Sequence, residues 1–280
     1  MKIFFLAILA TGLSFTVGAT EPIHLGGQEI KLGECKAFDM PLSDAAWKEA
    51  KKIPLAGRAA PLRETDKVKT VKVGIALPKD FDPKKKWPIL VVYATSDKTY
   101  SSSVNHLREY VPTATDLGWV AVAGDFPPEK EDCDQWRWAA VGTLLDAMHT
   151  AWPESKKWPV ACAGFSGGAK RSGWFGAIMS KDGYNVIGMW MGGCNADIPT
   201  QASRAYTPPP HYKHIPIFLS SGKRDSIATP SAHEAVKASL RQSGFMKVRL
   251  ESHDGDHSLN QDHIKMGLTW FMDEEKKLKK

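Results

Sequence analysis

The chain has 280 residues, of which 42% are hydrophobic and 24% are charged, and its formal net charge is +6. These proportions are ordinary for a soluble globular protein. The excess lysines gather in short clusters typical of solvated turns and a helix end, without nucleic-acid motifs or interleaved aromatic residues, so we expect no nucleic-acid partner.

The first residues predict a cleavable signal peptide over residues 1–19. Lys2 precedes an uncharged apolar run over 3–17, and small residues at 18–19 offer a cleavage site before Thr20. A membrane anchor is the alternative, but the run is shorter than the ~20 apolar residues that span a bilayer. No later segment is long enough to span either. We therefore expect a secreted or periplasmic protein with no stable membrane insertion.

Export makes the four cysteines candidates for disulfide bonds, although four cysteines can pair in three ways. Cys162 lies inside a predicted central strand. Cys133 and Cys194 both fall in loops that follow strands, so we expect the pair Cys133–Cys194. The spacing contains no C-x-x-C and does not predict a zinc site.

Residues 20–69 predict an N-terminal extension that packs on the core, with a short capped helix beginning near Ser43. From residue 70 to residue 280, β-rich runs alternate with helical stretches, without repeats or a linker, which predicts one α/β catalytic domain. Strands are expected at 71–77, 89–93, 119–123, 158–163, 186–191, 215–219 and 248–251, and helices at 135–152, 169–180, 230–243 and 261–276. Continuously apolar strands such as 89–93 indicate a mostly parallel sheet that is buried on both faces.

The most informative motif is the G-x-S-x-G sequence over residues 164–168, directly after the apolar run 158–163. A sharp turn from a strand into a helix strains its central residue, and flanking glycines let neighbouring backbones approach closely. Ser166 would thereby be exposed, with the first amides of helix 169–180 facing any oxyanion formed there. Taken alone, this motif is a weak pattern.

A serine hydroxyl needs a histidine to accept its proton and a carboxylate to orient that histidine. Asp225 follows the strand at 215–219, and His257 lies between the last strand and the last helix. The carboxyl ends of parallel strands meet at one edge of a sheet, and the order Ser-Asp-His is that of α/β-hydrolases. Asp197 and His253 are alternative acid and base residues. A metal site in the histidine-rich loop is disfavoured, because a hydrolase triad explains these residues without an ion.

The stretch from about residue 71 to residue 271 resembles the α/β-hydrolase superfamily, particularly secreted esterases of the feruloyl-esterase and polyhydroxybutyrate-depolymerase type. The resemblance rests on four segments, namely 77–83 leading into 87–92, the serine turn, 221–225 and 255–257. It implies an α/β-hydrolase fold, with a mostly parallel central sheet and helices on both faces. Loop material for a short lid is confined to residues 184–185 and 195–214.

The oxyanion hole needs two backbone N–H groups aimed at the developing charge. Gly167, directly after the nucleophile, is expected to supply one of them. In the family the second comes from the loop after the strand equivalent to 89–93, which often begins His-Gly. Here that loop reads Ala94-Thr95-Ser96-Asp97, so Thr95 or Ser96 is expected to donate instead.

These observations predict an exported serine hydrolase that cleaves a small-molecule or polysaccharide-linked carboxylic ester through an acyl-enzyme, without a cofactor or metal. A peptidase on the same triad is one alternative, and a catalytically silent protein that binds a carbohydrate or a protein partner is another. Four tryptophans could line a pocket near this edge, but core packing is the favoured interpretation for Trp136, Trp138, Trp174 and Trp190.

Overall fold

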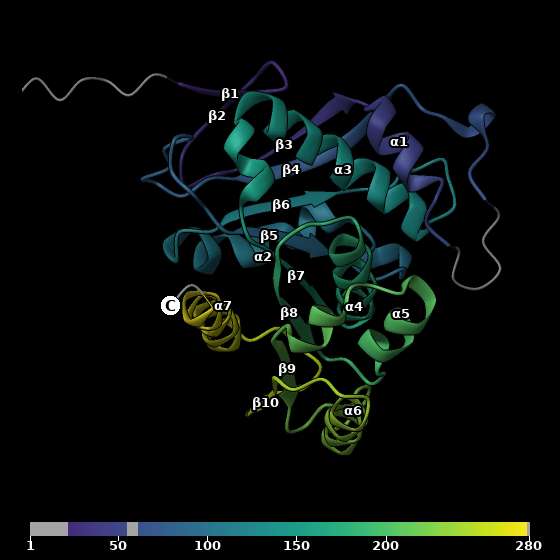
Figure 1. Ribbon diagram of the computed structural model, residues 1–280, viewed down its shortest axis with the longest axis vertical. Helices are drawn as coiled ribbons and strands as arrows, with labels where there is room; N and C mark the ends of the chain where they lie inside the picture. Colours follow the sequence, from purple (N-terminus) through teal and green to yellow (C-terminus); the bar gives the residue numbers. More distant parts are fainter. Residues whose placement is uncertain (1–21, 55–60, 279–280) are drawn as a thin grey trace, which may run out of the picture.

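The computed structural model describes residues 22–54 and 61–278, so the predicted signal peptide over 1–19 lies outside the described residues. Within the described part, the central sheet has eight strands in the order β10-β9-β8-β7-β5-β6-β4-β3 (Figure 1). Their bounds are β3 (Cys35–Pro41), β4 (Thr70–Ala76), β5 (Ile89–Tyr93), β6 (Val120–Gly124), β7 (Val160–Phe165), β8 (Val186–Gly192), β9 (Ile217–Gly222) and β10 (Val248–His253). A separate hairpin pairs β1 (Ile23–Leu25) with β2 (Gln28–Ile30).

The six neighbouring strands β10-β9-β8-β7-β5-β6 are mutually parallel, whereas β4 is antiparallel to both β6 and β3. Every residue of β5, β6 and β8 is buried, as expected for strands covered on both faces. The predicted mostly parallel α/β sheet is therefore confirmed, and the predicted strands are present with ends shifted by a few residues.

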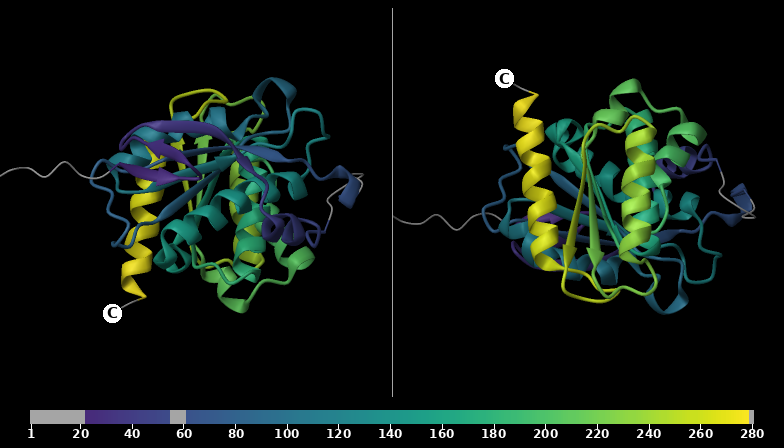
Figure 2. Two further views of the ribbon diagram at one scale, coloured as in Figure 1. Left: turned by 90° about the horizontal axis from the view of Figure 1, so that it is seen from above. Right: turned by 90° about the horizontal axis from the view of Figure 1, so that it is seen from below.

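Helices cover both faces of the sheet, as Figure 2 shows along two further directions. One face packs against α2 (Ser103–Asp116) and α7 (Gln261–Lys277). The other face packs against α3 (Asp134–Ala151), α4 (Gly167–Lys181) and α6 (Pro230–Gln242), with α1 (Asp44–Ala50) lying on α3. In the described residues, no helix is both long and apolar enough to cross a membrane.

The segment expected as loop material for a lid contains the helix α5 (Ile198–Tyr206) and the 3₁₀ helix η4 (Pro210–His214). Ile198, Ala202 and Tyr206 are buried at a spacing of four residues, which places them on one face of α5. That face packs on α4, where the rings of Tyr206 and Trp174 lie 5.6 Å apart, centroid to centroid. Much of the segment 195–214 is thus packed structure rather than free loop.

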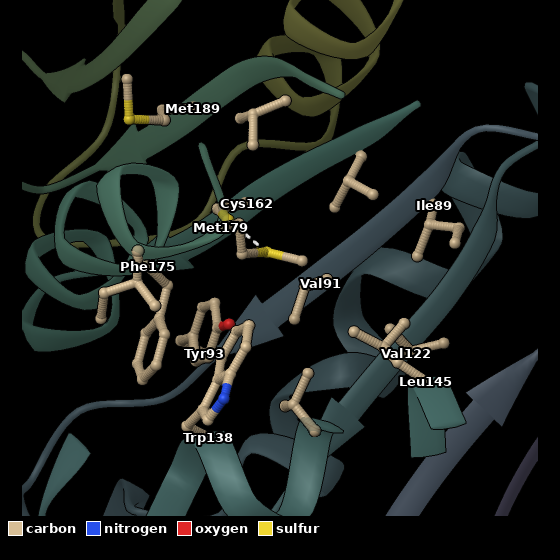
Figure 3. Close-up of a cluster of buried hydrophobic side chains, with 14 of the residues drawn as sticks. Ile89, Val91, Tyr93, Val122, Trp138, Leu145, Cys162, Phe175, Met179 and Met189 are labelled. Carbon is tan, nitrogen blue, oxygen red and sulfur yellow. Dashed lines mark hydrogen bonds between the residues drawn. The ribbon is translucent and has the colours of Figure 1, made fainter. Parts of the chain in front are cut away.

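The other three tryptophans considered for a pocket lie in the core. Trp136, Trp138 and Trp190 are each no more than 3% exposed. The Trp138 ring stacks against Phe175 with centroids 6.0 Å apart, and Figure 3 shows both rings beside Tyr93 in the layer between the sheet and its helices. The Trp190 indole donates to the carbonyl oxygen of His263 at 3.0 Å. These side chains stabilise the scaffold by packing.

The predicted disulfide between Cys133 and Cys194 is wrong: all four cysteines are in the described residues and all are free. Cys133 lies in the loop that follows β6, and Cys194 follows β8. These strands are separated by β5 and β7, so they run ~14 Å apart at the usual strand spacing. A disulfide requires its Cα atoms within about 7 Å. The thiol of Cys194 donates instead to the carbonyl oxygen of Ala196 at 3.3 Å.

Candidate active site

Ser166 occupies the turn between β7 and α4 with φ 56° and ψ −119°. Among the described residues, the only other non-glycine residue with positive φ is Thr207. Such a conformation costs about 1–3 kcal/mol and persists where the surroundings impose it. Here the Ser166 N–H donates to the carbonyl oxygen of Gly192 at 2.7 Å, which ties the turn to the end of β8. The geometry is that of a nucleophile elbow.

Two glycines of the motif are required by close backbone approach. A Cβ atom on Gly164 would lie 2.3 Å from the carbonyl carbon of Gly168, and one on Gly168 would lie 2.1 Å from the carbonyl oxygen of Tyr93. These neighbours are backbone atoms, which cannot rotate away as a flexible side chain would. The end of β5 therefore lies directly against the serine turn, as the sequence motif predicts.

Gly168→Ala is expected to lower the free energy of unfolding by about 3 kcal/mol, because its Cβ has no space beside Tyr93. Urea unfolding followed by circular dichroism measures this loss. Gly183→Ala is the matched control, since Gly183 has φ 84° but a Cβ there meets nothing within 4 Å. The control should lose only the cost of backbone strain, about 1 kcal/mol. Equal losses in the two variants would contradict the steric explanation.

Asp225 and His257 form a hydrogen-bonded pair. Nδ1 of His257 lies 2.7 Å from Oδ2 of Asp225, whose side chain is 1% exposed. The other carboxylate oxygen, Oδ1, accepts the N–H groups of Ile227 at 2.8 Å and Ala228 at 2.7 Å. Because an ionised carboxylate only accepts, the Nδ1 of His257 carries the proton, and Nε2 is left as the basic nitrogen.

The same contacts set the ionisation of Asp225. Burial raises the pKa of Asp225, but the hydrogen bonds from His257, Ala228 and Ile227 outweigh it and hold that pKa below its ordinary value. A lowered pKa in the folded state means that ionised Asp225 stabilises the fold above its unfolded pKa of about 3.9. That contribution is lost as the pH falls through the folded pKa. Asp225 is thus a carboxylate at neutral pH.

His257 lies beside the serine turn. Its ring packs on Phe165, the residue before Ser166, with centroids 4.7 Å apart. A Cβ on Gly193, in the loop after β8, would lie 2.8 Å from Cε1 of this ring. The end of β7, the loop after β8 and Asp225 after β9 therefore all contact the His257 imidazole, and the predicted Ser166, Asp225 and His257 each follow a strand at the carboxyl edge of the sheet.

The loops that carry Asp225 and His257 are also fixed to each other. Lys223 N–H donates to the carbonyl oxygen of His253 at 2.9 Å, and Arg224 N–H donates to that of Gly255 at 2.8 Å. A Cβ on Gly222 would lie 2.1 Å from the carbonyl oxygen of Asp256. The loops of Asp225 and His257 are therefore hydrogen-bonded to each other rather than independent.

The alternative acid and base residues have other partners. Asp197 caps α5, where its Oδ1 accepts the Thr200 N–H at 3.0 Å and its Oδ2 accepts the Ser239 hydroxyl at 2.5 Å. The His253 ring packs edge-on against His263 with centroids 5.3 Å apart. The carboxylate bound to His257 is that of Asp225, and the imidazole that packs on Phe165 is that of His257. Within residues 22–54 and 61–278, no group of three or more histidine, cysteine or acidic side chains could hold a metal ion.

The predicted oxyanion residues Gly167 and Thr95 are in contact, although the loop of residues 94–97, called the predicted oxyanion loop below, lacks His-Gly. Gly167 packs so closely on Thr95 that a Cβ on Gly167 would lie 2.3 Å from Thr95 Oγ1. Ser96 follows on the exposed side of the loop. Sequence reasoning missed the residues that hold this loop, the buried Arg137 and Arg171. Each arginine lies on the buried face of its helix, and this position can be recognised only once the packing of the helices is known.

Two large apolar side chains stand exposed on loops at this edge. Tyr100, between β5 and α2, is 60% exposed, and Ile227, two residues after Asp225, is 65% exposed. In the sheet order, β5 and β9 lie on opposite sides of the serine strand β7. The two exposed side chains therefore follow strands that lie on opposite sides of the serine strand.

A strained serine turn beside a histidine–carboxylate pair, at the carboxyl edge of a parallel sheet, is the arrangement of the α/β-hydrolase fold. No protein-family model matches the sequence, and no curated protein matches it. Solved structures do match. An α/β serine hydrolase without a lid from Xanthomonas campestris is 16% identical, with a TM-score of 0.52 over 88% of this chain and 97% of that one.

Two further solved structures match at a similar level. A protein of unknown function from Agrobacterium tumefaciens, a candidate α/β hydrolase, is 14% identical, with a TM-score of 0.50 over 75% of this chain and 93% of that one. A candidate dipeptidyl aminopeptidase IV from Bacteroides ovatus is 12% identical, with a TM-score of 0.50 over 86% of this chain. The match spans only 36% of the length of that protein. At these identities the likeness establishes the fold, and the chain has the α/β-hydrolase fold.

Proposed function

We propose that the protein is an exported serine hydrolase that cleaves carboxylic esters through Ser166, His257 and Asp225. The observation that carries the proposal is the 2.7 Å hydrogen bond between Asp225 and His257, whose ring packs beside the strained turn of Ser166. Hydrolases of this type use such a pair to activate a serine that a sharp turn exposes. The predicted signal peptide over residues 1–19 supports export.

The proposed reaction has two halves. Nε2 of His257 accepts the Ser166 hydroxyl proton while Oγ attacks the ester carbonyl carbon, and Asp225 stabilises the imidazolium that forms. The N–H of Gly167, with one from the predicted oxyanion loop, stabilises the tetrahedral oxyanion. The C–O bond then breaks, and His257 returns the proton to the leaving alcohol. Water attacks the acyl-enzyme by the same proton transfers and releases the acid.

The proposed substrate is a small-molecule or polysaccharide-linked ester. The resemblance to secreted feruloyl esterases favours an aromatic acyl group, and Tyr100 and Ile227 offer exposed apolar surface after strands on either side of the serine strand β7. Because Ser166, His257 and Asp225 supply the nucleophile and move the proton, the proposed steps call for no cofactor. A nucleic-acid partner and stable membrane insertion are not part of the proposal.

A substrate panel tests the proposal with the mature chain from residue 20. We expect p-nitrophenyl esters, feruloyl esters or acetylated xylan to be hydrolysed with kcat/KM at least a hundredfold above that for peptide p-nitroanilides. A preference for the peptide substrates would favour a peptidase on the same triad. Failure of a fluorophosphonate probe to label the folded protein would contradict a serine hydrolase altogether and favour a silent binding protein.

A further inference from the structure

Two buried arginines, Arg171 and Arg137, hold the loop that follows β5. Arg171, one turn into the helix that begins at Gly167, donates from Nη1 to the carbonyl oxygen of Ala94 at 2.9 Å. Its Nη2 donates to the Ser96 hydroxyl at 2.9 Å. The guanidinium therefore spans the loop and fixes it at two points, one of them on the backbone.

Arg137 of α3 holds the same loop from a second direction. Its side chain is fully buried, and its Nη2 donates to the carbonyl oxygens of Thr95 at 3.2 Å and Ser101 at 2.8 Å. Its Nη1 donates to the Ser103 hydroxyl at 2.6 Å. That hydroxyl in turn accepts the Ala94 N–H at 3.1 Å. Three backbone groups of residues 94 and 95 are thus fixed by side chains from three helices, namely Arg137 of α3, Arg171 of α4 and Ser103 at the start of α2.

The charges of the two arginines are balanced within the same cluster. Asp132 accepts Nε and Nη2 of Arg137 at 2.9 and 2.8 Å, and its Oδ2 also accepts Nη2 of Arg171 at 3.0 Å. Asp134 accepts Nε of Arg171 at 3.3 Å. Two buried cations therefore face two carboxylates, an arrangement that keeps the guanidinium groups fixed without an unpaired buried charge.

The carbonyl contacts determine where the N–H groups point. In a planar trans peptide, the carbonyl and the following N–H point in opposite directions, and the described residues contain no cis peptide bond. With the Ala94 and Thr95 carbonyls directed at Arg171 and Arg137, the N–H groups of Thr95 and Ser96 are directed away from the guanidinium groups. Thr95 itself lies against Gly167, so this part of the loop faces the serine turn.

We infer that Arg137 and Arg171 are positioning residues that orient the Thr95 and Ser96 peptides as oxyanion donors. The loop of residues 94–97 contains no glycine, so it lacks the conformational freedom that the usual His-Gly sequence provides. The inference rests on the proposed function, because it assigns the donors that stabilise the oxyanion on the carbonyl attacked by Ser166. Neither arginine touches the reacting atoms; each acts through the loop.

Arg171→Met tests the inference against Arg241→Met. Arg241 is an exposed arginine of α6 that also donates to a backbone carbonyl, that of Val248 at 3.4 Å, away from the serine turn. We expect Arg171→Met to lower kcat about a hundredfold with KM changed less than threefold, the size of effect seen when one oxyanion donor is lost. The affinity for an aryl trifluoromethyl ketone, which forms a tetrahedral adduct, should fall by the same factor. Arg241→Met should change neither quantity.

A milder variant covers the case in which Arg171→Met fails to fold. Ser103→Ala removes the acceptor of both the Ala94 N–H and Arg137 Nη1, and we expect it to lower kcat about tenfold at unchanged KM. Hydrogen exchange in the peptide that covers residues 94–97 should also become faster than in the wild type. A folded Ser103→Ala or Arg171→Met variant with wild-type kcat and wild-type ketone affinity would overturn the inference.

The rate of fluorophosphonate labelling separates this inference from the proposed function. The phosphonyl oxygen is expected to use the same donors, so labelling of Ser166 should slow in Arg171→Met and remain fast in Arg241→Met. Labelled wild-type protein with an equally fast Arg171→Met variant overturns the positioning role alone. Wild-type protein that is folded but never labelled contradicts the proposed function, and the positioning role with it.

Discussion

Ser166→Ala is expected to lower kcat for ester hydrolysis about a millionfold, because the substitution removes the attacking oxygen and leaves the other groups without a nucleophile. Labelling by a fluorophosphonate probe should be lost with it. Alanine has to adopt the same φ of 56° as serine, so the melting temperature should stay close to that of the wild type. Ester turnover, probe labelling and thermal unfolding measure these three quantities.

Ser231→Ala is the control for this variant, since Ser231 is an exposed serine on α6. It should keep wild-type turnover and labelling. Strong labelling of Ser166→Ala would show that another nucleophile reacts, and the proposed role of Ser166 would then be wrong.

Asp225→Asn is expected to lower kcat about ten-thousandfold, because the substitution changes the tautomer of His257. Oδ1 of Asp225 accepts two backbone N–H groups, so an asparagine must turn its carbonyl oxygen toward Ile227 and Ala228. Its NH₂ group then faces Nδ1 of His257, which has to accept, and the imidazole proton moves to Nε2. A histidine in that form cannot take the proton of Ser166. The pH dependence of kcat, compared with that of the wild type, measures the loss.

Asp197→Asn distinguishes the two acid residues that the sequence leaves open. Asparagine is also a good helix N-cap, so this variant should keep the cap of α5 and lose little more than the Ser239 contact. We expect its kcat to stay within threefold of the wild type. A greater loss in Asp197→Asn than in Asp225→Asn would assign the acid to Asp197.

Much of the fold can be predicted from the sequence because its strands are continuous apolar runs, which few structures other than a covered parallel sheet accommodate. The helix α2 was not among the predicted helices, although Val104, Leu107, Val111 and Ala114 are buried at helical spacing. Pro112 lies inside it and interrupts the usual helix signal. The edge strand β3 was also missed, since only Met40 of its residues is buried and they give no continuous apolar run.

Those residues of the candidate site that lie just after the ends of strands could be predicted from the sequence. Ser166, Asp225 and His257 each follow a different strand of one parallel sheet, and such ends meet at one edge. The arginines behind the predicted oxyanion loop could not be predicted in the same way. Their partners are backbone carbonyls at sequence separations of 42 and 77 residues, and no local pattern marks an arginine as buried against them. The disulfide prediction was wrong for a related reason, since it ignored the strand order between β6 and β8.

The strand order also indicates which part of the candidate site is least protected against local unfolding. His257 is carried by the loop after β10, the last strand of the sheet, which pairs only with β9 within the described residues. Proteins open locally with free energies well below that of global unfolding, and the margins of a sheet open more readily than its centre. Ser166, by contrast, directly follows the central strand β7. Local unfolding at this edge would displace His257, the proposed base, while the turn of Ser166 and most of the protein stay folded, so we expect the proposed activity to be lost before the fold.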